Sequence, residues 1–183
     1  MSVAPASVDL LVVGAGPAGR ALAHRALATG LRVTVIDPAP QTPWTATFGM
    51  FVDDLPAWLD PGVIECAATQ FVVYTPHRRT IDRGYCTVGA AALQAALDLS
   101  GATVVTASAD RLTATSVTLG DGTELSAGCV VDARGGTAPD RSRTAPARQR
   151  AVGARIPAAA DATAAAPDEM VLMDWSRSPA TAP

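Results

Sequence analysis

One stretch, from Asp9 to Asp37, constrains the fold more than any other part of the sequence. It begins with Leu10–Val13, a short apolar run rich in branched residues, as expected of a strand buried on both faces. Three glycines then form the pattern G-x-G-x-x-G, at Gly14, Gly16 and Gly19. In a phosphate-binding turn of this pattern, the first glycine permits the tight turn and the second leaves room for a pyrophosphate beside the backbone. The third lets the following helix pack closely on the strand.

The second half of the stretch continues the same arrangement. A helix is predicted from about Pro17 to Thr29, with Gly30 as a C-terminal cap, and its first N–H groups and positive dipole end would face the phosphates. Leu31–Ile36 predicts a second buried strand, and Asp37 follows it at the spacing where an acid binds ribose hydroxyls. The stretch therefore predicts a βαβ unit that binds a dinucleotide.

A glycine pattern alone would also fit a structural turn, because a chain rich in Ala and Gly produces such patterns by chance. The preceding strand, the following helix and the acid at the expected spacing favour the dinucleotide site. An acid at Asp37 favours a free 2′-hydroxyl, since a 2′-phosphate would be repelled. FAD or NAD is therefore expected rather than NADP.

Composition limits the remaining function classes. With 49% hydrophobic and 17% charged residues and a net charge of −3, the 183 residues indicate a soluble globular domain with its own core. Basic blocks with interleaved aromatic residues are absent from the sequence, which argues against a nucleic-acid partner. Cys66, Cys86 and Cys129 lack metal-binding spacing, so we expect no metal site and interpret them as reduced thiols of a cytoplasmic protein. We see neither a secretion signal nor an apolar run long enough to span a bilayer.

Four of the chain's few aromatic residues lie within residues 44–58, which we predict to be a loop and a short helix. Two interpretations stay open, because aromatic rings serve packing and apolar ligands alike: anchoring to the core, or lining a flavin or an apolar substrate. The same stretch contains Asp53 and Asp54. A role as helix-capping or solvated acids is favoured for both over a role in catalysis.

The middle of the chain predicts short strands around one helix. Residues 70–75 are expected to form a strand, residues 76–79 a basic turn, and residues 89–99 a helix with Leu93 and Leu97 on its core face.

Four short strand candidates follow, over residues 102–106, 110–114, 116–119 and 124–126, and predict a small antiparallel meander. A buried strand over residues 129–131 then predicts a return to the parallel sheet. Its DARGG end, with Asp132 and Gly135, is expected close to the cofactor.

Together these elements predict an α/β fold, namely a Rossmann-like FAD/NAD(P)-binding domain with a parallel sheet and an inserted antiparallel β-meander. We expect this domain to span residues 8–136, after a disordered tail of residues 1–7. Residues 137–183, with strand candidates at 151–157 and 170–175, are expected to be a linker and the beginning of an incomplete substrate domain.

Five segments carry a resemblance to a known family: DLLVVGAGPAGRALA, VTVIDPAPQTPWTATFGMFVDDL, RGYCTVGAAALQAAL, CVVDARG and PDEMVLMDW. In this order, and over nearly the whole chain, they resemble the lycopene cyclase family of FAD-dependent carotenoid enzymes, in its bacterial β-cyclase branch. The glycine pattern is shared by many flavoproteins, whereas PWTATFG and VLMDW are specific to the family. The chain departs from the family at Gly89 and Ala90, where an acid or amide is usual, and at Arg134, where Ser or Thr is usual.

The resemblance implies FAD, in its reduced form, as cofactor and lycopene as substrate. It implies a redox-neutral, acid-catalysed isomerisation that closes the ends of lycopene to β-ionone rings, and a lycopene substrate implies peripheral contact with a membrane. The acidic motif that the resemblance assigns to protonation lies beyond VLMDW, so the catalytic residue is unknown. The expected cofactor-binding residues are Gly14, Ala15, Gly16, Pro17, Ala18, Gly19, Asp37, Pro38, Arg83, Asp132 and Gly135.

Two alternatives remain open at the level of the sequence. One is an FAD-dependent oxidoreductase or monooxygenase that acts on an apolar substrate. The other is a non-catalytic, truncated dinucleotide-binding fragment that holds the cofactor without turning a substrate over.

Overall fold

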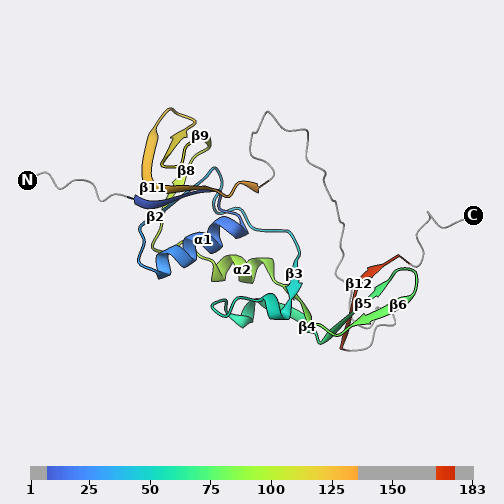
Figure 1. Ribbon diagram of the computed structural model, residues 1–183. Coiled ribbons are helices and arrows are strands. Elements are labelled where there is room, and N and C mark those ends of the chain that lie inside the picture. Colours follow the sequence, from blue (N-terminus) through green and yellow to red (C-terminus); the bar gives the residue numbers. More distant parts are fainter. Residues whose placement is uncertain (1–7, 136–167, 176–183) are drawn as a thin grey trace, which may run out of the picture. The chain divides into compact units, whose positions relative to one another are not determined.

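The computed structural model describes residues 8–135 and 168–175 (Figure 1). The chain divides into two compact units, and the first comprises Met1–Trp44 and Leu97–Arg148. The second comprises Thr45–Ala96 and Gln149–Pro183. The boundary expected at residue 136 lies at the edge of the described range.

The first unit is organised by one six-stranded sheet with the order β8-β2-β1-β11-β10-β9. Its strands β8, β2, β1 and β11 are parallel, and β9 and β10 extend it in antiparallel pairing. The strands are β1 (Val8–Val13), β2 (Val33–Asp37), β8 (Thr103–Thr106), β9 (Ala109–Leu112), β10 (Ser116–Leu119) and β11 (Glu124–Asp132).

Both faces of β1 are buried, which explains its continuous apolar run. Alternate side chains point to opposite faces of a strand. On one face the core consists of Leu10, Val12, Val33, Val35 and, from the helix α1, Ala23 and Ala26. On the other face it consists of Leu11, Val13, Ile36, Ala109, Val117 and Leu119, the last three from the meander.

Helix α1 (Pro17–Ala28) lies against the sheet (Figure 1) and confirms the predicted βαβ unit. Pro17 occupies its first turn, where the missing N–H costs nothing. At its other end Gly30 has φ +84°, and its N–H donates to the Leu27 carbonyl, as in a glycine-terminated helix. The predicted end at Thr29 is one residue late.

Two details of the predicted meander are wrong. The strand β8 pairs in parallel with β2, from Thr34 and Thr103 onward, and therefore belongs to the parallel sheet. The two short strands expected over residues 124–126 and 129–131 are one strand, β11, which pairs with β10 at its beginning and with β1 at its end. Gly128 sits at this change of partner, and its Cα lies so close to the Asp9 carbonyl that a Cβ would be 3.1 Å from the oxygen.

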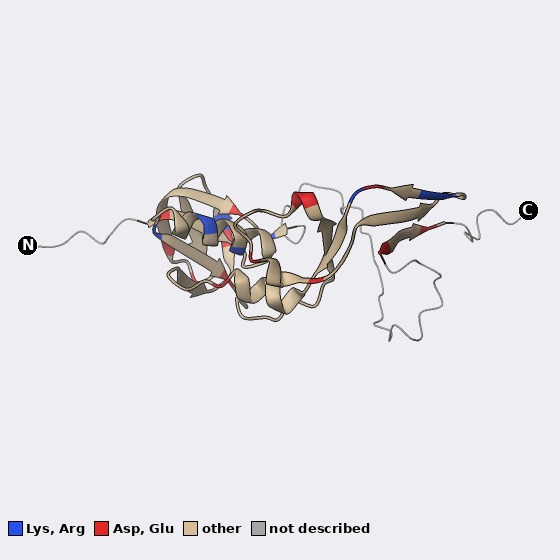
Figure 2. Ribbon diagram, turned by 90° about the horizontal axis from the view of Figure 1, so that it is seen from below, with Lys and Arg blue, Asp and Glu red and all other residues tan. Residues whose placement is uncertain are grey.

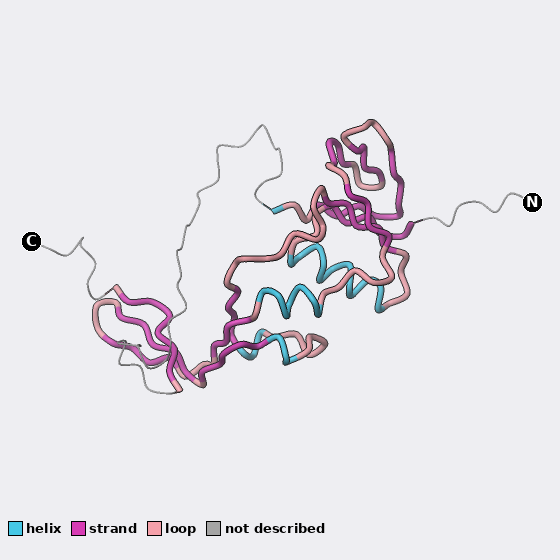
Figure 3. Tube along the Cα trace, turned by 180° about the vertical axis from the view of Figure 1, so that it is seen from behind, coloured by secondary structure: helices cyan, strands magenta, loops and turns pink. Residues whose placement is uncertain are grey.

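The second unit contains two three-stranded sheets, with the orders β3-β7-β4 and β12-β5-β6. Figure 3 shows these strands and the short helices of the chain. The elements are β3 (Phe48–Phe51), η1 (Val52–Asp54), η2 (Pro61–Val63), β4 (Ile64–Ala68), β5 (Gln70–Tyr74), β6 (Arg78–Ile81), β7 (Tyr85–Val88), α2 (Ala90–Ala96) and β12 (Glu169–Asp174).

Several predictions fall in this unit. The strands expected over residues 70–75 and 170–175 are confirmed as β5 and β12, which pair in parallel. Residues 48–51, expected as loop, form β3, and the expected basic turn over 76–79 includes the beginning of β6. The helix expected over 89–99 is shorter, although Leu93 and Leu97 are buried as predicted. The strand expected over 151–157 lies outside the described residues.

Charged residues of both signs are interspersed over the chain (Figure 2), and some of them join strands. Arg78 of β6 forms an ion pair with Glu169 of β12, and Gln70 of the intervening β5 donates to the same carboxylate at 3.1 Å. No helix within residues 8–135 and 168–175 is both long and apolar enough to cross a membrane.

Candidate functional site

The glycine turn between β1 and α1 needs its first and third glycines for backbone reasons. Gly14 has φ +109°, a conformation that side chains disfavour, and a Cβ there would lie 2.7 Å from the Ala133 carbonyl oxygen. A Cβ on Gly19 would overlap the carbonyl oxygen of Gly14. Close packing of the turn, the helix and the end of β11 therefore fixes these two positions.

Gly16 is different, because neither the backbone conformation nor the packing at this position requires a glycine. It has φ −71°, and a Cβ built on it meets no protein atom within 4 Å. Gly16 is also the N-cap residue of α1, and among the described residues no side chain forms a capping hydrogen bond there. The uncapped N–H groups and the helix dipole leave a positive potential beside open space, which suits an anionic group such as a pyrophosphate.

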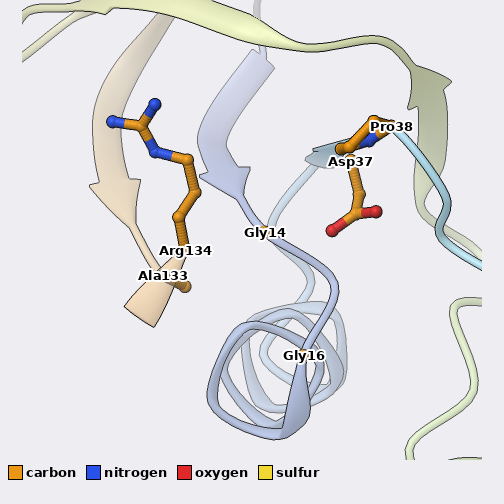
Figure 4. Close-up of a pocket in the computed structure, with 6 residues that line it drawn as sticks. All are labelled: Gly14, Gly16, Asp37, Pro38, Ala133 and Arg134. Atoms are coloured by element: carbon orange, nitrogen blue, oxygen red, sulfur yellow. The ribbon is translucent and has the colours of Figure 1, made fainter. Parts of the chain in front are cut away.

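Asp37, the last residue of β2, faces this turn (Figure 4). Its Oδ2 accepts the backbone N–H of Ala15 at 2.8 Å, and its Oδ1 accepts that of Ala39 at 2.7 Å. Each carboxylate oxygen keeps a further acceptor position after these bonds. The carboxylate is therefore held in place and can still accept hydrogen bonds from the hydroxyls of a ligand.

The glycine turn, the end of β2 and the end of β11 enclose a pocket of about 330 Å³. This volume is near the small end of the range for ligand sites, roughly 300–1,000 Å³, and fits part of a dinucleotide. Its lining residues are Gly14, Gly16, Asp37, Pro38, Ala133 and Arg134 (Figure 4).

Four of the predicted cofactor-binding residues thus line one pocket: Gly14, Gly16, Asp37 and Pro38. Ala15, Pro17, Ala18 and Gly19 belong to the same turn and the first residues of α1. Asp132 and Gly135 flank Ala133 and Arg134, two lining residues that were not among those predicted to bind the cofactor. The DARG segment after a buried strand was the signal for both.

The side chain of Arg134 turns away from Gly16 (Figure 4) and is fixed by three hydrogen bonds to two groups. It donates from Nε and Nη2 to the Asp132 carboxylate, at 2.9 and 2.7 Å, and from Nη1 to the Ala109 carbonyl at 3.0 Å. Hydrogen bonds from Arg134 hold the pKa of Asp132 below its usual range. Asp132 therefore orders the loop that forms the third wall of the pocket.

Arg83, also predicted to bind the cofactor, lies in the second unit. It donates to the Asp53 carboxylate at 2.9 and 3.0 Å and to Asp54 at 2.9 Å, and its guanidinium lies 3.6 Å from the centre of the Phe51 ring. Arg83, Asp53 and Asp54 therefore form an exposed charge cluster. Cofactor binding by Arg83 stays a prediction. The Phe51 ring also packs edge-on against Tyr85, with ring centres 5.4 Å apart, as an anchoring role predicts.

Within the described residues, no group of His, Cys, Asp and Glu side chains could hold a metal ion.

The sequence matches the family model described as "Lycopene cyclase protein" over residues 9–182. The chain belongs to the lycopene cyclase family. The resemblance noted in the sequence is thereby confirmed over nearly the whole chain.

Two proteins show how similar this lycopene cyclase family member is to its relatives. It is 40% identical over 90 residues to an uncharacterized carotenoid cyclase of Deinococcus radiodurans, covering 49% of this chain and 22% of the relative. It is 39% identical over 80 residues to the chloroplastic lycopene beta cyclase of Nicotiana tabacum, covering 43% of this chain and 16% of the relative. The aligned part is thus about a fifth of the length of these relatives.

Solved structures support the fold. A putative FAD-containing monooxygenase of Photorhabdus luminescens aligns with a TM-score of 0.51 and 16% identity, covering 71% of this chain and 40% of that one. PqsL, a probable FAD-dependent monooxygenase of Pseudomonas aeruginosa, aligns with a TM-score of 0.52 and 16% identity, covering 67% and 41%. The lycopene cyclase family member therefore has the Rossmann-like fold predicted from its sequence, with the parallel sheet and the antiparallel extension.

Proposed function

We propose that this chain binds FAD in the pocket between β1, β2 and β11, as the flavin-binding part of a carotenoid cyclase-type protein. The observation that carries the proposal is the pairing of Gly16, with open space where a side chain would be, and the fixed carboxylate of Asp37 in one pocket. The pyrophosphate would lie beside Gly16 and the N-terminus of α1. The adenosine ribose would donate its hydroxyls to Asp37.

The choice among dinucleotides follows from charge and from the family. The Asp37 carboxylate would repel the 2′-phosphate of NADP, which leaves FAD and NAD. Membership in a family of carotenoid cyclases, together with the fold of FAD-containing monooxygenases, supports FAD.

The proposed reaction is the redox-neutral closure of lycopene ends to β-ionone rings. Reduced FAD would supply electrostatic stabilisation of the cationic transition state. The residues described here would hold the cofactor: the turn at Gly16 its pyrophosphate, Asp37 its ribose, and the Asp132–Arg134 pair the adjoining loop. A substrate as apolar as lycopene resides in lipid, so the proposal includes peripheral contact with a membrane, which flotation of the protein with lipid vesicles tests.

Cofactor binding is tested by titrating the purified chain with FAD and following the fluorescence of the flavin. We expect saturable binding that ADP displaces and that FMN and NADP, at the same concentrations, displace far less. FMN lacks the adenosine diphosphate half, and NADP carries the repelled phosphate. A chain that takes up no FAD, or binds NADP as tightly as FAD, would overturn the proposal.

The reaction is tested by producing the chain in a bacterial strain that accumulates lycopene. A cyclic carotene formed without net consumption of NAD(P)H supports the cyclase. An oxidised carotenoid formed with NAD(P)H consumption would instead identify an FAD-dependent oxidoreductase. Unchanged lycopene with intact FAD binding would identify a non-catalytic dinucleotide-binding protein.

A further inference from the structure

Arg20, on the first turn of α1, is a buried charge next to the pocket. Only 4% of the surface of Arg20 is exposed to solvent. A guanidinium stays ionised at any physiological pH, so its burial is costly unless its N–H groups find acceptors. Within the described residues no carboxylate forms an ion pair with Arg20.

Backbone carbonyls from three separate segments accept its hydrogen bonds instead. Nε donates to Ala15 of the glycine turn at 3.2 Å, Nη2 to Pro40 of the segment after β2 at 2.6 Å, and Nη1 to Leu97 at 3.3 Å. The guanidinium also lies over the Trp44 ring, 5.7 Å from its centre. Trp44 ends the segment that begins at Pro38, so this segment contacts Arg20 at two places.

These contacts lie close to the bonds made by Asp37. The N–H of Ala15 donates to Asp37, while the carbonyl of Ala15 accepts from Arg20. On the other side, Asp37 accepts from Ala39 and Arg20 donates to Pro40, the next residue. The glycine turn and the segment after β2 are therefore joined twice, once by a carboxylate at the pocket and once by a guanidinium in the interior.

We propose that Arg20 is a positioning residue of the nucleotide pocket, an inference that rests on the proposed function. It acts through Ala15 and Pro40 and fixes the distance between the wall formed by Asp37 and Pro38 and the turn at Gly16. Arg20 is not among the residues that line the pocket. Only a planar group with several N–H donors can reach three carbonyls in different directions, so neither Lys nor Met can replace it.

The test compares Arg20→Met and Arg20→Lys with Arg25→Met, a matched loss of charge at an exposed position of the same helix. We expect the dissociation constants of FAD, ADP and adenosine to rise at least tenfold in Arg20→Met and several-fold in Arg20→Lys. In Arg25→Met they should stay within twofold of the wild type. Dissociation constants of Arg20→Met equal to those of Arg25→Met would overturn the proposal.

Adenosine separates positioning from electrostatic attraction, because it carries no phosphate. A loss confined to FAD and ADP, with adenosine binding unchanged, would show that the charge of Arg20 attracts phosphate, and the positioning role would be wrong.

Hydrogen–deuterium exchange of the ligand-free proteins tests the positioning role of Arg20 without any cofactor. In Arg20→Met and Arg20→Lys we expect faster exchange in residues 38–44 and unchanged exchange in β1. Equal acceleration everywhere would indicate general destabilisation and overturn the inference. Because this measurement needs no ligand, failure of the wild type to bind FAD would contradict the proposed function alone.

Discussion

The backbone N–H of Ala15 donates a hydrogen bond to the carboxylate of Asp37 at 2.8 Å, across 22 residues of sequence. The bond joins the middle of the glycine turn to the end of β2. It places the acid at a fixed distance from the N-terminus of α1 before any ligand arrives. A site arranged in advance binds more tightly, because no free energy is lost in ordering its groups when the ligand binds.

Replacing Asp37 by alanine removes both the proposed acceptor for the ribose hydroxyls and the link to Ala15. We expect the dissociation constant of FAD to rise roughly 10- to 100-fold, which corresponds to about 1.5–3 kcal/mol for a charge-assisted hydrogen bond. Isothermal titration of Asp37→Ala with FAD gives this number. Glu124→Ala, which removes an exposed acid of the same unit, should bind FAD as the wild type does. An equal loss of FAD affinity in both variants would show that the effect comes from net charge.

Gly19→Ala should destabilise the fold, because the added Cβ would overlap the Gly14 carbonyl. Overpacking of this kind costs about 1–3 kcal/mol, and more where backbone must move. The midpoint of urea unfolding should therefore fall markedly in this variant. Gly16→Ala serves as control, since its Cβ meets no described atom within 4 Å and the cost is limited to the poorer N-cap preference of Ala, up to about 1 kcal/mol. Equal stability of the two variants would contradict the packing described for the turn.

The Asp9–Arg32 ion pair predicts a pH dependence of stability. Arg32 donates to Asp9 from its side chain and its backbone N–H, and these bonds lower the pKa of Asp9 from 3.8 to about 2. A carboxyl with a depressed pKa in the folded state contributes stability above its unfolded pKa and loses it as the pH falls. The difference in the free energy of unfolding between the wild type and Asp9→Asn should be constant above about pH 5 and fall progressively below it, with most of the change complete at about pH 2.

Urea unfolding at a series of pH values measures this difference, since the other carboxyl groups titrate alike in both proteins. A difference that stays constant down to pH 2 would mean that Arg32 does not stabilise the charged form of Asp9.

The βαβ unit could be predicted because its signals are local. The apolar run of β1, the glycines and the acid each act within a few residues of where they stand. Strand partners are not local. The short, largely exposed strand β8 pairs with β2, which precedes it by more than sixty residues, and nothing in TVVT distinguishes this edge strand from one in the meander. Gly128 permits close approach of β11 to β1, which the sequence pattern did not indicate.

The pocket shows the same limit. Gly14, Gly16, Asp37 and Pro38 could be predicted from spacing, but Ala133 and Arg134 reach the pocket only because β11 pairs with β1. Arg20 is a charged residue within a helix, and its three acceptors lie in segments up to 77 residues away. From sequence alone, a charged residue in a helix is expected on the solvated face. The burial of Arg20 could not be predicted, because its contacts depend on the tertiary fold.

The most direct test of the account is the affinity of Gly16→Val for FAD. The backbone at Gly16 accepts a side chain, because φ is −71° and no described atom lies within 4 Å of an added Cβ. The variant Gly16→Val uses this space. Its valine side chain would, however, occupy the place proposed for the pyrophosphate. We predict a folded protein whose thermal unfolding midpoint falls by only a few degrees, because Val is a poorer N-cap residue than Gly, together with a loss of FAD affinity of at least 100-fold, measured by equilibrium dialysis. Unchanged FAD affinity in a folded Gly16→Val protein would show that the dinucleotide does not bind at this turn.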